Sequence, residues 1–395
     1  MAFSLVFYNA ILLLSTLFVW LSEKASTPMQ KKVCTLIAFL IVFLPAALRY
    51  EIGIDYFSYK IIFENIRDGL DPFWQSKMEP GFYFLNWMVA NLGLGFEWLV
   101  GLTSLIIFTL FFLTYPKKYK AYYHFLLITL VYFTANNLLR NWLALGFVWL
   151  AVFSYLKEPR LFRFLVLIFI GSLFHKSVIL FLAFPLLAKL NIFARNKLAY
   201  IFVSLLIIFL ALWSDTLIKW LMSGSLSQAL GYARYSSGWY AQDTELGSGI
   251  GVLIKILFLA YPLLWLNTSN PRDDFASNKI IILLIWIAII SIIAAAKISI
   301  FHRMAHLFAF VFNLILLWYL LNKKVPFSRV AVWLFLTFMF LTFNKSILDG
   351  STDYMETCRG ARITPYISVF NKEDSTRDPH LTRFARWCDA YFENK

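Results

Sequence analysis

Ionisable and aromatic side chains gather in a few short segments that separate long apolar runs. The first is R-Y-E-I-G-I-D-Y-F-S-Y at residues 49–59, which holds Arg49, Asp55, Tyr56 and Tyr59. Arginine forks suit phosphate oxygens, and a carboxylate is one of the groups that can act as a general base. The two tyrosines are aromatic surfaces on which a sugar ring could stack. This segment therefore predicts a site for a compound that carries both phosphate and sugar.

Three further segments add residues of the same kinds. E-P-G-F begins at Glu79, N-N-L-L-R runs from Asn136 to Arg140, and H-K-S contains His175 and Lys176. Arg303 follows His302 further along the chain. Four cations (Arg49, Arg140, Lys176 and Arg303) could stabilise charge that develops on phosphate oxygens without a metal. A proton acceptor could be His175, which titrates near neutrality, or Asp55, a weaker base unless burial raises its pKa.

The elements that carry these residues are predicted to be membrane helices. The 395 residues are 60% hydrophobic and only 15% charged, whereas soluble domains are about 45–50% apolar. Apolar runs of about 20 residues are typical of spanning helices. We expect an all-α, polytopic membrane bundle of about twelve spans, with which a GT-C-like architecture is compatible. The expected spans are 3–21, 33–48, 97–115, 122–139, 142–156, 161–174, 177–188, 198–214, 249–266, 280–297, 302–321 and 330–345.

The distribution of charge orients these spans. The net charge of +14 resides in short clusters between apolar runs, which is the positive-inside pattern and argues against a nucleic-acid-binding stripe. Loops 22–32, 116–121, 157–160, 189–197, 267–279 and 322–329 carry far more Lys and Arg than Asp and Glu. Loops 49–79 and 215–248 and the tail carry nearly balanced charge. The chemistry-bearing residues are therefore expected on the non-cytoplasmic face, together with both termini.

Two segments are too short to be ordinary spans. Residues 80–92 are apolar, but counting them as a span would reverse the charge alternation, so they are expected to form an interfacial or re-entrant helix. Residues 161–188 keep the alternation only as two short helices with an apex at His175-Lys176-Ser177. The first of these would span roughly 21 Å against a hydrocarbon core of about 30 Å, which places the apex in a recess.

The sequence indicates one membrane domain followed by a polar tail. We expect a transmembrane catalytic domain at residues 1–345 and a periplasmic tail at 346–395. The first apolar run lacks a basic start and an obvious cleavage site, so it is expected to be a retained helix. Cys358 and Cys388 would share an oxidising compartment in this topology, and we expect them to form a disulfide. No cofactor and no metal is required by any motif.

The ordered motifs R-Y-x-x-G-x-D-Y-x-x-Y, E-P-G-F, N-x-x-x-R and H-K-S resemble those of the EpsG family of polysaccharide polymerases, relatives in function of the Wzy-type O-antigen polymerases. The resemblance is best over residues 40–190. Asn141 stands where the family commonly has Gln. The resemblance implies an enzyme of the bacterial inner membrane that joins oligosaccharide repeat units carried on undecaprenyl diphosphate at the periplasmic face. It also implies a chain-length-regulating co-polymerase as a partner, besides the membrane lipids.

In the reaction that the resemblance implies, an acceptor sugar hydroxyl attacks the donor anomeric carbon and undecaprenyl diphosphate leaves. His175, Asp55 and Arg140 are then the candidate catalytic residues. The candidate ligands for the diphosphate and sugar are Arg49, Lys176, Arg303, Tyr56, Tyr59, Glu79 and Asn136. An O-antigen-ligase-like glycosyltransferase remains an alternative. A lipid-linked oligosaccharide flippase would need polar groups toward both faces, whereas here they gather on one.

Overall fold

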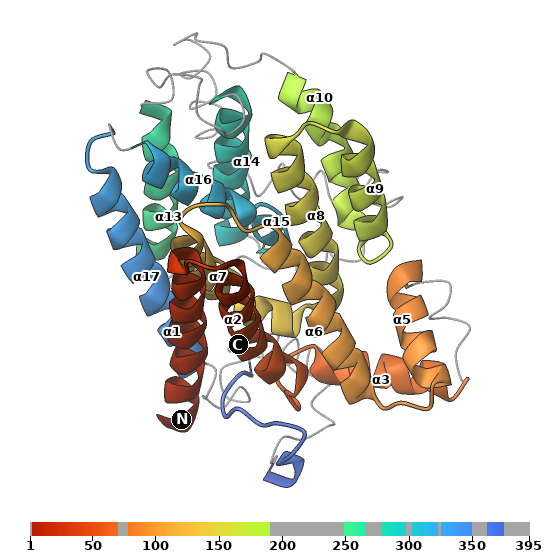
Figure 1. Ribbon diagram of the computed structural model, residues 1–395. Coiled ribbons are helices and arrows are strands. Elements are labelled where there is room, and N and C mark those ends of the chain that lie inside the picture. The colour runs from red at the N-terminus through yellow and green to blue at the C-terminus, as the bar shows by residue number, and fades with distance from the viewer. Residues whose placement is uncertain are drawn as a thin grey trace, which may run out of the picture. The chain divides into compact units, whose positions relative to one another are not determined.

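The computed structural model describes residues 2–69, 78–189, 249–264, 278–297, 302–322, 325–349 and 362–374 (Figure 1). Its regular elements in these ranges are helices. Two compact units divide the chain: the first contains residues 1–183 and 336–383, and the second contains 184–335 and 384–395.

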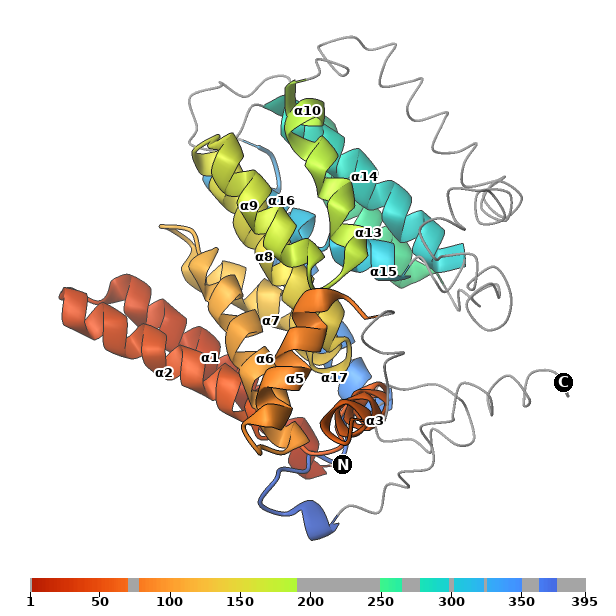
Figure 2. The same ribbon diagram turned by 90° about the vertical axis from the view of Figure 1, so that its right-hand side faces the viewer.

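The first unit contains most of the predicted chemistry-bearing residues. Helices α1 and α2 form an antiparallel pair, and α6 packs against both α2 and α8 (Figure 2). The elements of this unit are α1 (Ala2–Lys24), α2 (Pro28–Ala47), α3 (Tyr56–Arg67), α5 (Pro80–Asn91), α6 (Phe96–Leu113), α7 (Lys120–Asn137), α8 (Leu139–Lys157), α9 (Leu161–Ser172), η1 (Lys176–Ala183) and the second half of α17 (Ser328–Asp349).

Local sequence explains where several of these helices begin and end. Thr27 caps α2 through a reciprocal capping box with Gln30, and Pro28 occupies the first helical position, where its missing N–H costs nothing. Pro80 starts α5 in the same way. Leu138, with φ −98° and ψ 65°, lies outside helical geometry and separates α7 from α8. That break turns the chain immediately before Arg140.

Several buried polar groups of the first unit are paired with one another. His124 of α7 bonds through Nε2 to Ser15 Oγ of α1 at 2.7 Å and through Nδ1 to the hydroxyl of Tyr115. The hydroxyls of Thr114 and Tyr123 lie 2.7 Å apart. Because an unpaired polar group in an apolar interior is costly, these bonds fix which faces of α1 and α7 meet.

The second unit is also helical in its described part. Its elements are α10 (Phe184–Lys189), α13 (Ile250–Ala260), η4 (Tyr261–Leu264), α14 (Asn278–Lys297), α15 (His302–Leu307), α16 (Phe310–Leu321) and the first half of α17. A stack of aromatic rings joins its helices: Phe258 lies 3.7 Å from Phe335 and 5.0 Å from Tyr319, centroid to centroid. The Tyr319 hydroxyl donates to the Phe258 carbonyl at 3.0 Å.

The helices agree with the multi-pass prediction, with two differences. Five of them, α1, α2, α6, α8 and α17, are long and apolar enough to cross a membrane. Of the helix pair expected at 161–188, α9 is the first member and η1 begins the second, and the short helix expected at 80–92 is α5. The single span expected at 302–321 is instead broken between α15 and α16. Helix α3 was not predicted, and the span expected at 198–214 lies outside the described residues.

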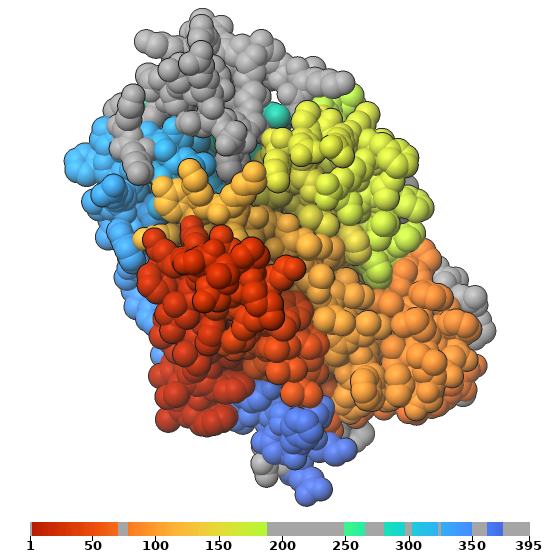
Figure 3. Space-filling view, viewed as in Figure 1, coloured from red at the N-terminus to blue at the C-terminus, as the bar shows by residue number. Residues whose placement is uncertain are grey.

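A C-terminal strap, residues 362–374, lies across the ends of α1, α2 and α17 (Figures 1 and 3). Arg49 and Ser368 form an antiparallel bridge. Hydrogen bonds join the strap to the rest of the first unit: Tyr50 N–H to Ile367 O (2.9 Å), Val369 N–H to Leu48 O (2.9 Å), Gly53 N–H to Arg362 O (3.1 Å), Tyr8 OH to Ile363 O (2.7 Å), Thr364 OH to Ile347 O (2.9 Å), Tyr366 N–H to Ser4 Oγ (2.9 Å) and Tyr366 OH to Pro45 O (3.0 Å). This part of the tail is therefore integral to the first unit.

Replacing Tyr8 by Phe is expected to loosen the strap. The change removes the buried hydroxyl that donates to the Ile363 carbonyl. Loss of this bond should make opening of the strap easier by about 1 kcal/mol. We expect trypsin to cleave at Arg362 or Lys372 about fivefold faster in Y8F than in the native protein. Tyr83→Phe, at a half-buried position of α5, is the control. Equal cleavage rates in Y8F and the native protein would show that this bond does not hold the strap.

Candidate active site

A close contact between α5 and the end of α9 sets the frame of the candidate site. The Gly81 N–H donates to the Leu173 carbonyl at 2.8 Å. A Cβ at Gly81 would lie only 2.8 Å from that oxygen and 2.9 Å from Leu173 Cβ, so only glycine permits this approach. The contact joins two segments of the resemblance, because Glu79 precedes α5 and His175 follows α9.

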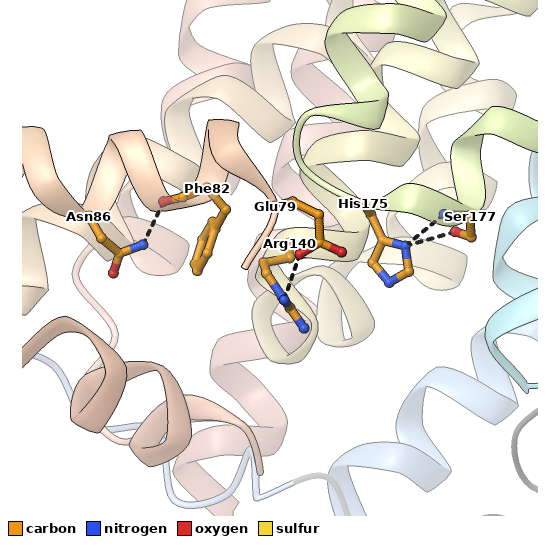
Figure 4. Close-up of polar contacts among 6 residues, drawn as sticks. All are labelled: Glu79, Phe82, Asn86, Arg140, His175 and Ser177. Carbon is orange, nitrogen blue, oxygen red and sulfur yellow. Dashed lines mark hydrogen bonds and ion pairs between the residues drawn. The ribbon is translucent and has the colours of Figure 1, made fainter. Parts of the chain in front are cut away.

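Arg140 is held by an ion pair and by a tyrosine. Its Nη1 lies 2.7 Å from Oε2 of Glu79, with the two side chains 30% and 10% exposed. The Tyr59 hydroxyl also lies within hydrogen-bonding reach of the side chain and backbone of Arg140. Burial, supported by the nearby Asp55 carboxylate, raises the pKa of Tyr59 to about 12, so this phenol stays protonated at neutral pH. Figure 4 shows the Glu79 carboxylate turned toward Arg140. A half-buried guanidinium of fixed orientation is the result.

Asp55 is positioned by the end of α7. The Asn137 Oδ1 accepts the Asp55 N–H at 2.9 Å. Gly53 turns the chain with φ +99°, and a Cβ there would lie 3.1 Å from both Cα and Oδ1 of Asn137. The turn thus rests directly on Asn137, three residues before Arg140. Sequence reasoning named Asn136 as the site residue, and the adjacent Asn137 is the one that holds the loop.

His175 lies in the turn between α9 and η1. Its Nδ1 accepts the Ser177 N–H at 3.3 Å and lies 2.8 Å from Ser177 Oγ. The ring is half-buried, and the neighbouring Lys176 is exposed. Figure 4 shows the imidazole and Ser177 beyond Glu79 on the side away from Asn86. The predicted apex is therefore a structured turn with an oriented imidazole.

Arg49 and Tyr56 are buried in the first unit rather than open to solvent. Arg49 is 1% exposed and donates to the Ala46 carbonyl and to Ser104 Oγ, the latter at 2.9 Å. Burial lowers its pKa to about 10, so it remains a cation at neutral pH. Tyr56 is 3% exposed, and burial raises the pKa of its hydroxyl. With the strap in place, neither side chain presents a surface to a substrate.

The remaining predicted residues are placed elsewhere or fall outside the described ranges. Asn136 is buried and lies near the Tyr132 hydroxyl, both residues belonging to α7. Arg303 belongs to α15 of the second unit, where Arg303 and Lys255 both lie near His306. The predicted disulfide partners Cys358 and Cys388 lie outside the described residues. The first unit therefore brings together Asp55, Tyr59, Glu79, Arg140 and, through the α5–α9 contact, His175.

Substituting Asn137 by Leu should release the Asp55 loop. The change removes the acceptor of the Asp55 N–H while keeping a side chain of similar size. Loss of one such bond is worth a factor of about 2–10, which we expect as a fall in the rate of the chain elongation that the motif resemblance implies. Thr134→Val, which alters a bond only within the same helix, is the matched control. A rate for N137L equal to that of T134V would rule out this positioning role.

The fold and the site together define a multi-pass helical membrane protein with an oriented Arg–Glu pair beside an aspartate and a histidine. The model of the EpsG family matches residues 32–368. No curated protein and no solved structure matches the chain. Because the match covers most of the sequence, the chain belongs to the EpsG family, as the ordered motifs predicted. Membership implies a membrane-embedded polysaccharide polymerase with glycosyltransferase activity.

Proposed function

We propose that this protein joins oligosaccharide repeat units carried on undecaprenyl diphosphate, at the periplasmic face of the bacterial inner membrane. The observation that carries the proposal is the Arg140–Glu79 pair, held by Tyr59 and adjoined by Asp55. These residues come from segments far apart in the sequence, and the distribution of Lys and Arg favours the non-cytoplasmic face for all of them. A site for a lipid-linked donor at that face is what the arrangement supports.

Arg140 is proposed to bind the diphosphate of the donor. Its fork matches phosphate oxygens in geometry, and Glu79 and Tyr59 orient it before substrate arrives. Arg140 is the second residue of α8, so the positive end of the helix dipole would attract the same phosphate oxygens as its guanidinium does. As the bond between the anomeric carbon and the diphosphate breaks, negative charge grows on the phosphate oxygens. A preoriented cation stabilises that charge more than it stabilises the ground state.

The acceptor hydroxyl needs a proton acceptor, for which Asp55 and His175 are the candidates. Asp55 begins α3 beside Tyr59, and its backbone is fixed by Asn137. A base held within hydrogen-bond reach contributes about 10²–10⁴-fold to rate. Arg49 is proposed to support the site without contacting substrate, by keeping the loop between α2 and Asp55 in place beneath the strap. The exposed Lys176 is proposed to meet the charged lipid headgroup.

The test is reconstitution of the purified protein in liposomes with lipid-linked oligosaccharide as the single substrate. We expect a ladder of longer lipid-linked chains, and the same ladder in the presence of a chelator, since Arg140 supplies the positive charge. A flippase would protect the oligosaccharide from an external glycosidase without lengthening it. A ligase would act only after lipid A core is added. Either of these two outcomes would refute the proposed polymerase.

A further inference from the structure

The α9–η1 turn fixes which nitrogen of His175 carries a proton. Ser177 N–H and Ser177 Oγ both face Nδ1, at 3.3 and 2.8 Å. The turn itself is closed by backbone bonds from His175 N–H to Gly171 O and from Val178 N–H to His175 O, each 3.2 Å long. The ring and its serine are thus part of one compact turn (Figure 4).

A backbone amide can only donate a hydrogen bond, so the Nδ1 that receives it must present its lone pair. In the neutral imidazole one nitrogen accepts and the other donates. With Nδ1 as the acceptor, the proton of the neutral ring resides on Nε2. The Ser177 hydroxyl can then donate to Nδ1 as well. A ring in this tautomer offers an N–H group, not a lone pair, at the nitrogen directed away from Ser177.

We propose that His175 acts on the donor diphosphate as a hydrogen-bond donor through Nε2–H, and that Asp55 is the base. This inference rests on the proposed polymerase function and deepens it. The acceptor hydroxyl oxygen forms the new bond to the anomeric carbon, and its proton passes to the Asp55 carboxylate. The carbon–oxygen bond to the diphosphate breaks, and the electron pair stays on the departing phosphate oxygen. Nε2–H of His175 and the Arg140 guanidinium stabilise that oxygen.

Ser177 is then a positioning residue that acts through His175. Its backbone N–H donates to the lone pair of Nδ1, and this bond keeps the proton of the neutral ring on Nε2. A histidine in this state cannot remove the acceptor's proton without first losing its own. Asp55 has no such restriction, because a carboxylate accepts through either oxygen.

Two substitutions at His175 separate a donor from a base. Glutamine carries an N–H group at about the reach of Nε2 but cannot act as a base, whereas alanine offers neither. We expect H175Q to make the ladder about 10- to 100-fold faster than H175A, the range for a hydrogen bond to a charged group. Equal loss in the two variants, both of them folded, would overturn the donor role.

Nitrogen-15 NMR of histidine-labelled protein reads the tautomer without any need for turnover. The His175 signals are assigned by their absence in H175Q. We expect Nδ1 of His175 to resonate as an unprotonated, pyridine-type nitrogen in the native protein and also in Ser177→Ala, because alanine keeps the backbone N–H that donates to Nδ1. A protonated Nδ1 in the native protein would refute the role proposed for His175 and leave the proposed polymerase function standing. A native protein that makes no ladder would refute the proposed function, and with it the role of His175 on a diphosphate.

Discussion

Replacing Arg140 by Ala is expected to lower the kcat/KM of chain elongation by about 10²–10³-fold, the loss seen when one preoriented stabiliser of developing charge is removed. The guanidinium is held by Glu79 at 2.7 Å and by Tyr59, so its orientation is set before substrate binds. Arg140→Lys keeps the charge but loses the planar fork, and we expect an activity between those of R140A and the native protein. Elongation is measured from the ladder at equal amounts of folded protein.

The chain supplies its own control for this substitution. Arg67 pairs with Asp68 at 2.8 Å, but both side chains are nearly half exposed, and such surface pairs contribute about 0–1 kcal/mol. Arg67→Ala should leave elongation unchanged. Glu79→Gln should lower activity less than R140A does, because Arg140 keeps Tyr59 while losing its carboxylate. A folded R140A protein that elongates at the native rate would remove Arg140 from the site.

The sequence was most informative where physical constraints act locally. Hydropathy and charge predicted the short helix at 80–92, observed as α5 (Pro80–Asn91), because a further span there would reverse the distribution of Lys and Arg. The same reasoning divided 161–188 into two helices, and the structure has a turn at His175 between α9 and η1. Both results follow from the apolar length of the segment and from the Lys and Arg clusters on either side of it in the sequence.

Other features depend on contacts between distant residues. The strap is held by bonds such as Tyr8 to Ile363, and no local pattern in a polar tail indicates where its backbone donors and acceptors find partners. Asn137 and Asn136 are adjacent asparagines, and only the break at Leu138 decides which of them receives the Asp55 N–H. Sequence spacing alone could not distinguish them.

Helix α3 could have been predicted and was not. Its buried residues Tyr56, Phe57, Tyr59 and Phe63 follow a helical period. The segment falls in the expected loop 49–79 because it holds no apolar run of membrane length. Tyr56 and Tyr59, expected to stack on sugars, are consequently buried, and Tyr59 instead supports Arg140.

Gly81→Ala should have the second large effect, although residue 81 carries no side chain that could do chemistry. The added Cβ would lie 2.8 Å from the Leu173 carbonyl oxygen. Because that atom belongs to the backbone, the clash is relieved only if α5 and the end of α9 move apart. Glu79 is two residues before Gly81 and His175 two residues after Leu173, so the two would separate. A displacement of about 1 Å at a reacting group can reduce rate by about 10²-fold, which is the loss expected in G81A.

Gly101→Ala in α6 is the matched substitution. A Cβ there meets only Ala47 Cβ at 4.0 Å, so we expect native activity and a thermal stability equal to or slightly above that of the native protein. Thermal unfolding in detergent and the elongation rate are measured on both variants. If G81A lost stability but elongated at the native rate, the α5–α9 contact would be structural only. A G81A protein that is folded and slow would instead show that this contact sets the distance between the Arg140–Glu79 pair and His175.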